Sequence, residues 1–107
     1  QERANNGLPA YSWDSNMASY SDRRAKEIVT DYSHNSAGGN WSVGENIAEG
    51  ETSASEVVND WMNSAGHKAN ILSDVSTKTS VSCYVENFTY ADGSTQYLYH
   101  WVQNFTH

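Results

Sequence analysis

The strongest constraint on the fold of this chain is a pair of β-rich segments near its C-terminal end. Residues 76–88 and 96–105 are rich in Val, Thr, Ser and Tyr, which favour strands. Between them stands Asp92-Gly93, a dipeptide typical of tight hairpin turns. We therefore predict that the two segments pair as an antiparallel hairpin.

A long helix is predicted upstream of the hairpin. Asp14 or Ser15 can cap a helix that starts near Asn16 and ends near Asp31, and a loop is expected over residues 33–40. Small and apolar residues recur on this helix at three- and four-residue spacing, which predicts a single buried stripe of Ala18, Ser21, Ala25, Ile28, Val29 and Tyr32.

The middle of the chain contains a second helix. Residues 52–55 offer caps for it, and Glu56 falls in its first turn. Glycines bracket residues 44–50, a segment too short for a stable helix and therefore expected to be extended or a turn. Helices first and a hairpin last predict an α+β fold with helices on an antiparallel sheet. The predicted buried face of the second helix is Val57, Val58, Trp61, Met62 and Ala65, with Gly66 ending it and a short helical turn over 67–72.

Charge and composition exclude several classes of function. The 107 residues carry a net charge of −7 with only six Lys or Arg, whereas phosphate backbones are bound by clustered cations. Arg23, Arg24 and Lys26 are interspersed with acids and are predicted to face water. No apolar run approaches the roughly 20 residues of a membrane span. We expect one domain over residues 1–107, a monomer without nucleic-acid partners, and a buried, inert thiol at Cys83.

The first residues resemble the end of a helix. Gln1 to Asn6 suit a last helical turn, and Gly7 is a typical stop signal. We therefore expect an incomplete first helix and a chain that is a processed or excised piece of a longer secreted protein.

Two histidines and two glutamates are the candidates for chemistry. Neutral imidazoles with nearby carboxylates can bind zinc or another divalent ion, and the same groups can act as general acid and base. His34, Glu45, Glu56 and His67 are spaced by 11 residues, but the intervening glycines exclude one continuous helix. The pattern alone leaves two alternatives open: a shared site, or two loop histidines and two solvated glutamates.

Sequence motifs along the chain resemble the CAP superfamily, the family of cysteine-rich secretory proteins, venom allergens and pathogenesis-related plant proteins that carry SCP domains. The resemblance runs in order over essentially the whole chain and is to the bacterial branch. The blocks that carry it are Arg3-Ala4, Gly7-Leu8-Pro9, Trp13-Asp14, Tyr32-Ser33-His34, Gly44-Glu45-Asn46-Ile47-Ala48, Glu56-Val57-Val58, Trp61-Met62, Ser64, Gly66-His67-Lys68-Ala69-Asn70-Ile71-Leu72 and Trp101-Val102-Gln103-Asn104-Phe105.

This resemblance implies a fold and a site. The family fold is a three-layer α-β-α sandwich around a small antiparallel sheet, and its cleft tetrad falls on His34, Glu45, Glu56 and His67. In relatives the two histidines can hold a divalent metal, often zinc, while the glutamates orient the imidazoles and hold water. Gln103 matches a glutamine near the same cleft. Asn46 and Asn70 match positions expected to brace the backbone.

Some positions depart from the family pattern. Thr79-Ser80-Val81-Ser82 stands where family members usually have Ile-Gly-Val-Gly, so this strand is expected to pack or twist differently. The disulfides and cysteine-rich tail of the eukaryotic branch are absent, so its sterol-binding and channel-blocking roles are not transferred. His100, beside Trp101, is interpreted as core or edge packing in preference to a third metal ligand.

Three functions follow as hypotheses. The first is a secreted or cell-surface domain whose His/Glu cleft binds a divalent metal such as zinc and a small ligand or protein partner. The alternative is a metal- or His/Glu-assisted hydrolase, including a peptidase, with Ser33 as the serine nearest to His34. The third, lipid carriage, requires a long apolar groove. With carboxylates close by, His34 and His67 are predicted to protonate more readily than free imidazole.

Overall fold

The structure, a computed structural model, describes residues 1–35 and 44–106. The predicted loop over residues 33–40 is therefore described only to Asn35, and the rest of it lies outside the described residues. The elements are α1 (Glu2–Asn5), β1 (Ser12–Trp13), α2 (Ser15–Thr30), β2 (Gly44–Glu49), α3 (Ala54–Met62), α4 (Ala65–Ile71), β3 (Lys78–Thr89) and β4 (Thr95–Thr106).

The C-terminal hairpin forms as predicted, with the first strand starting two residues later and the second extending one residue further at each end. β3 and β4 pair antiparallel from Lys78↔Thr106 to Thr89↔Thr95. In the turn, Gly93 has a φ of 87°, a left-handed conformation that glycine adopts without steric cost. The backbone N–H of Ser94 donates to the Asp92 carboxylate at 2.9 Å, so both residues of the Asp-Gly signal shape the turn.

The sheet has the order β1-β3-β4-β2. Residues 44–49 are extended, as expected, and β2 pairs antiparallel with β4 from Gly44↔Phe105 to Glu49↔His100. β1 pairs parallel with β3, so the sheet is mixed, whereas the sequence predicted a purely antiparallel one. This two-residue strand gave no periodic signal, because β-alternation needs a run of several residues to be recognised.

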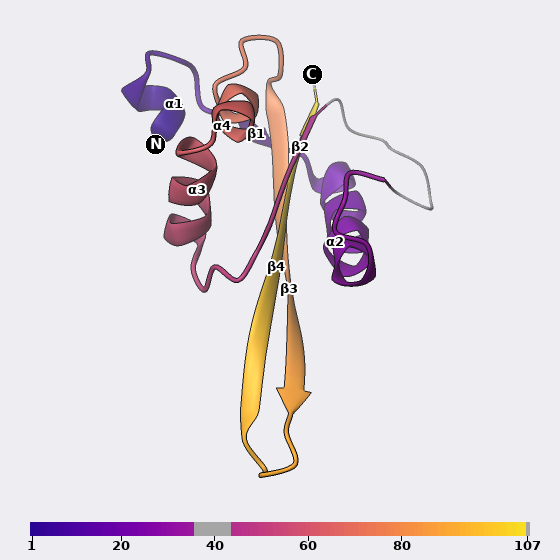
Figure 1. The fold of residues 1–107 in the computed structure, drawn as a ribbon. Helices are drawn as coiled ribbons and strands as arrows, with labels where there is room; N and C mark the ends of the chain where they lie inside the picture. Colours follow the sequence, from indigo (N-terminus) through magenta and orange to yellow (C-terminus); the bar gives the residue numbers. More distant parts are fainter. Residues whose placement is uncertain (36–43, 107) are drawn as a thin grey trace.

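Helices cover both faces of the sheet, with α2 on one side and α1, α3 and α4 on the other (Figure 1). Side chains of β4 alternate between these layers. Val102 is buried with residues of α2 and β2, whereas its neighbour Trp101 and also Phe105 pack with Val57 and Trp61 of α3. The α+β fold with three layers is therefore confirmed.

Helix α2 begins where its cap predicts. The Asp14 carboxylate accepts hydrogen bonds from the backbone N–H groups of Asn16 and Met17. The buried face lies closer to the helix start than the predicted stripe, because Met17 and Tyr20 belong to it and Tyr32 is exposed. It also includes Arg24, whose side chain is fully buried. The prediction that Arg24 faces water is therefore wrong.

The second helical region divides differently from the prediction. The Ser53 hydroxyl caps α3 by accepting from the backbone N–H of Glu56 at 3.1 Å, and Val57 and Trp61 are buried. α3 ends at Met62, and Ser64 is the N-cap residue of α4. Gly66, predicted to end the helix, therefore lies inside α4, because the chain turns two residues earlier.

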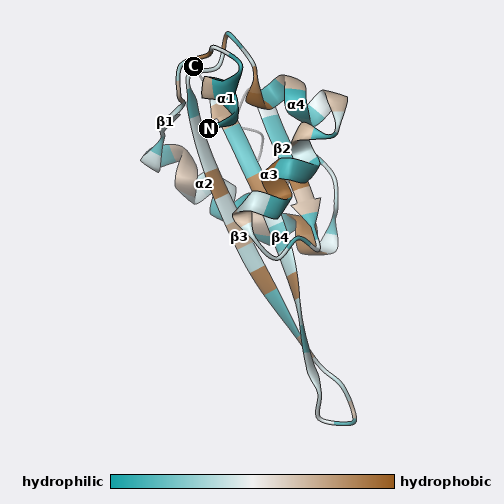
Figure 2. Ribbon diagram, turned by 90° about the vertical axis from the view of Figure 1, so that its left-hand side faces the viewer, coloured by the Kyte–Doolittle hydropathy of each residue, from teal (hydrophilic) through white to brown (hydrophobic). Residues whose placement is uncertain are grey.

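The far end of the hairpin projects beyond the helical layers (Figures 1 and 2), giving the molecule an elongated shape of 51 × 30 × 23 Å. Cys83 is exposed on β3, contrary to the prediction of a buried thiol. Its side chain shares the sheet face of its cross-strand partner Trp101, whereas α2, the helix that contacts β3, lies on the opposite face. Large side chains on and beside the hairpin arm are exposed: Tyr84, Val85, Phe88, Tyr90 and Tyr97.

Candidate functional site

A buried ion pair joins α2 to the start of β2. The Arg24 guanidinium donates from Nε to Glu45 Oε2 and from Nη2 to Glu45 Oε1, both at 2.8 Å. The Arg24 side chain is 0% exposed and that of Glu45 is 9% exposed. Such a bidentate pair fixes both the position and the orientation of the carboxylate.

Arg24 also holds the backbone on both sides of His34. Its Nη2 donates to the Ser33 carbonyl at 2.7 Å, and its Nη1 donates to the Asn35 carbonyl at 2.9 Å. Nη1 also donates to Glu27 Oε1 at 3.0 Å. All five N–H donors of the guanidinium are therefore used.

The structure brings His34 and Glu45 together. His34 Nδ1 lies 3.0 Å from Glu45 Oε1, which also accepts from Arg24. The imidazole is 61% exposed, so one of its nitrogens contacts the carboxylate while the ring faces solvent. Glu45 thus lies where it can orient the imidazole, as the resemblance implies.

Glu45 is held in its charged form. Burial by itself raises the pKa of Glu45, but hydrogen bonds from Arg24, Asn104 and His34 outweigh that effect, and the net pKa is lowered. The Asn104 amide contributes by donating to Glu45 Oε2 at 3.0 Å. A carboxylate in this state is a strong acceptor for the ring N–H of His34.

Behind Glu45 lies a buried network of hydroxyl groups. Ser21 Oγ of α2 donates to Asn104 Oδ1 at 2.7 Å and lies 2.5 Å from Ser80 Oγ of β3. Ser80 and Ser82 stand where the resemblance predicts glycines, and the Ser82 hydroxyl donates to Asp22. This strand therefore contacts α2 through two hydroxyls, which no glycine supplies.

His67 lies on α4, which is docked against the start of β2. The Asn46 amide donates to the His67 carbonyl at 3.2 Å, and the Asn70 amide donates to Asn46 Oδ1 at 2.9 Å and to the Glu45 carbonyl at 3.3 Å. These are the contacts that a bracing role for the two asparagines requires. They place the His67 backbone beside the strand that carries Glu45.

The partner of the His67 ring is a serine. His67 Nδ1 lies 2.9 Å from Ser64 Oγ. Burial lowers the pKa of His67, and the nearby charge of His34 lowers it further. The prediction that carboxylates make this histidine easier to protonate is therefore wrong for His67, whose pKa is lowered by burial and by the charge of His34.

The structure does not bring Glu56 beside the histidines. Its carboxylate accepts from the Thr52 hydroxyl at 3.3 Å, in the first turn of α3. α3 follows the Glu49 end of β2, which lies about 13 Å along the strand from Glu45. Ser64 lies beside the His67 ring, whereas the resemblance implied that the two glutamates orient the imidazoles. The available signal was the position of Ser64 three residues before His67, at the start of a helix.

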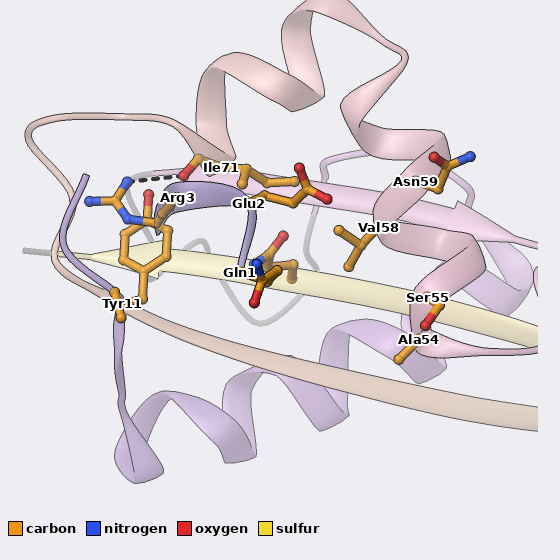
Figure 3. Close-up of a pocket in the computed structure, with 11 residues that line it drawn as sticks. Gln1, Glu2, Arg3, Tyr11, Ala54, Ser55, Val58, Asn59 and Ile71 are labelled. Atoms are coloured by element: carbon orange, nitrogen blue, oxygen red, sulfur yellow. Dashed lines mark hydrogen bonds between the residues drawn. The ribbon is translucent and has the colours of Figure 1, made fainter. Parts of the chain in front are cut away.

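The Gln103 side chain lies on the sheet face opposite that of Glu45, the face covered by α1, α3 and α4. Its Oε1 accepts from the Asn46 amide at 3.4 Å, and it lines a hollow of about 630 Å³ between α1, α3 and the sheet. Figure 3 shows this hollow, with Arg3 donating to the Ile71 carbonyl at 3.0 Å. The described lining of the hollow does not include His34 or His67, although Asn46 donates both to Gln103 and to the His67 carbonyl.

His100 is buried, as the packing interpretation expects. Only 1% of it is exposed, and its Nε2 lies 3.0 Å from Glu86 Oε1 while Nδ1 lies 3.2 Å from Glu49 Oε2. Across residues 1–35 and 44–106, no group of three or more His, Cys, Asp or Glu side chains has the arrangement of a metal site.

The fold, with helices on both faces of a small sheet, is that of an SCP-type α-β-α domain. The sequence model of the family described as CAP, cysteine-rich secretory protein family, matches residues 1–105. The chain belongs to this family. No helix in the described parts of the chain is long and apolar enough to cross a membrane.

Known proteins of several bacteria are similar to this chain. The uncharacterized protein YkwD of Bacillus subtilis (strain 168) is 50% identical over 46 residues, which are 43% of this chain and 18% of YkwD. The chain thus matches less than a fifth of that protein's length.

Two solved structures share the fold. An outer surface protein from Borrelia burgdorferi has a TM-score of 0.67 and 18% identity over 98% of this chain and 84% of that one. An extracellular protein containing an SCP domain from Bacillus anthracis str. Ames has a TM-score of 0.68 and 21% identity over 99% of this chain and 37% of that one.

Proposed function

We propose that His34 and His67 together hold a divalent metal ion such as zinc, and that the domain has a binding or interaction role outside the cell. The observation that carries this proposal is the pairing of each Nδ1 with a protein group, Glu45 for His34 and Ser64 for His67. Ligating histidines commonly have one ring nitrogen held in this way, and in both rings Nε2 is then the nitrogen left for a ligand.

The chemistry of the pair suits a metal ligand set. A histidine must be neutral to ligate, and the lowered pKa of His67, caused by burial and then by the charge of His34, favours that form near neutral pH. Two protein ligands leave further positions for water or for a donor from a partner. When bound, the ion would supply a Lewis acid and a fixed point for an outside ligand.

An extracellular location is supported by the neighbours in structure. They are described as an outer surface protein and an extracellular protein, and the first hypothesis from the sequence is a secreted domain. The His34 ring is 61% exposed, so a small ligand or a protein partner can reach the site without rearrangement of the core.

A zinc titration tests the proposal. Calorimetry with Zn²⁺ should show binding to the wild type and none to His34→Ala or His67→Ala. Glu45→Gln should bind roughly 10- to 100-fold more weakly, because it loses the carboxylate that orients His34. Glu56→Gln is the matched control and should bind as the wild type does. Equal heats for the wild type and His34→Ala would exclude the shared site.

Hydrolysis is the second candidate, and one contact favours it. Ser64 Oγ lies 2.9 Å from His67 Nδ1, the geometry of a nucleophile beside a base. Ser33, the candidate from sequence, instead accepts from the backbone N–H of Asn35 at 3.2 Å. Ester and peptide panels would separate the mechanisms. Turnover lost in Ser64→Ala but insensitive to a chelator indicates a serine mechanism, whereas the reverse result indicates a metal.

A further inference from the structure

We propose that Arg24 is the positioning residue of this site: it sets the place and the ring tautomer of His34 through Glu45 and through the two carbonyls that flank His34. The effect on the ring does not depend on a metal. The effect on zinc affinity rests on the proposed function, and the experiment below separates the two.

A single rigid group, the Arg24 guanidinium, contacts the backbone on both sides of His34 and the carboxylate beside its ring. Nη2 donates to the carbonyl of Ser33, just before the histidine, at 2.7 Å and to Glu45 Oε1 at 2.8 Å. That same Oε1 lies 3.0 Å from His34 Nδ1. Nη1 donates to the carbonyl of Asn35, just after the histidine, at 2.9 Å. Backbone and ring of His34 are therefore located by the same guanidinium.

Packing does not hold the ring, so these hydrogen bonds must. The His34 side chain is 61% exposed, whereas the Arg24 side chain is 0% exposed. A buried planar group with every donor used has little freedom to move. It can therefore transmit the rigid position of α2 to a ring that lies at the surface.

The tautomer of His34 follows from the hydrogen bonds at Glu45. Both carboxylate oxygens accept from Arg24, so Glu45 acts as an acceptor and the ring presents Nδ1–H to it. The lone pair is then on Nε2, the nitrogen that remains for a ligand. Arg24 keeps both oxygens of Glu45 in place, and without it this buried carboxylate loses its main hydrogen-bond partner.

Only arginine has the required geometry. The guanidinium directs five N–H groups along fixed directions in one plane, whereas lysine has three donors on a single atom. Arg24→Lys keeps the positive charge but cannot reach Glu45, Ser33 and Asn35 together. If Arg24 were only a structural anchor, Arg24→Lys would lower the stability of the protein and leave the His34 ring unchanged.

The test is an NMR measurement on metal-free protein at neutral pH. Ring ¹⁵N shifts of His34, His67 and His100 are compared for the wild type, Arg24→Lys and the control Arg23→Lys, whose parent side chain on the same helix is 44% exposed. We expect Arg24→Lys to move His34 alone from the Nδ1–H form toward the mixture of free imidazole. Arg23→Lys should leave all three rings unchanged. Unchanged His34 shifts in folded Arg24→Lys would overturn the proposal.

Two further measurements keep the test decisive. If Arg24→Lys does not fold, the wild type decides alone, because a His34 ring with the tautomer mixture of free imidazole contradicts the proposal. Zinc affinity of folded Arg24→Lys should fall roughly 10- to 100-fold. If the wild type binds no Zn²⁺, the proposed function fails, while the metal-free ring shifts still decide the role of Arg24.

Discussion

At the residue scale, Ser80 illustrates how this chain departs from its family's pattern without loss of packing. A hydroxyl buried in place of a glycine needs a hydrogen-bond partner, because an unpaired polar group in the interior is costly. Ser80 is 0% exposed, and its Oγ lies 2.5 Å from Ser21 Oγ, which donates to Asn104. The serine on the strand is therefore matched by a serine on the helix.

Replacement of Ser80 should show this coupling. We expect Ser80→Ala to lower the free energy of unfolding by about 1 kcal/mol, since it removes a buried hydrogen bond. Urea unfolding followed by tryptophan fluorescence measures the change. Ser82→Ala is the control, because its bond to Asp22 is exposed and should contribute less. A larger loss for Ser82→Ala than for Ser80→Ala would contradict the assignment.

At the element scale, α2 does more than cover one face of the sheet. Its buried row carries Arg24, which holds Glu45 of β2 and the segment that contains His34. The start of the helix is in turn fixed by Asp14, which accepts from two backbone N–H groups and follows directly after β1. The placement of the site therefore depends on where this one helix begins.

The cap of α2 can be tested with the same substitution at its two ends. Asp14→Ala should lower the free energy of unfolding by about 1 kcal/mol, because two N–H groups lose their acceptor. Asp31→Ala, at the C-cap, should be neutral or slightly stabilising, since a negative charge is unfavourable at that end of the helix dipole. Thermal unfolding of both variants checks this, and equal losses would count against the capping role.

At the scale of the whole molecule, two groups of the site couple stability to pH. Burial raises the pKa of Glu45, but hydrogen bonds outweigh it and the net pKa is lowered. The pKa of His67 is lowered by burial and by the charge of His34. The unfolded chain therefore binds protons more readily than the folded one at both groups. Each contributes stability that is lost as pH falls.

The lowered pKa values of His67 and Glu45 fix the pH ranges in which stability is lost. The His67 contribution should decline from the ordinary histidine value of 6.5 downward, and that of Glu45 from 4.5 downward. Thermal midpoints between pH 8 and 3 should thus fall with acidity in the wild type. His67→Ala should make the thermal midpoint less dependent on pH below pH 6.5, and Glu45→Gln should do the same below pH 4.5. Curves parallel to the wild type would refute the assignment.

Local chemistry was enough to predict much of this fold. The Asp92-Gly93 turn, the Asp14 cap and the extended segment after Gly44 are settled by residues a few positions apart, which is why sequence patterns reveal them. The motifs around His34, Glu45 and His67 likewise indicated the family. Helix and strand periods say which residues share a face, and these predictions required no knowledge of distant contacts.

Tertiary contacts decided the rest, and they did so where polar groups are buried. From helical periodicity alone, a charged residue is expected to face solvent. Arg24 is nevertheless buried, because the carboxylate of Glu45, 21 residues away, neutralises its charge. The spacing of Ser64 and His67 allowed their contact, but no local pattern could tell that Glu56 is bonded to Thr52. A buried charge is stable only beside its partner, and which side chains become partners depends on how helices and strands meet in space.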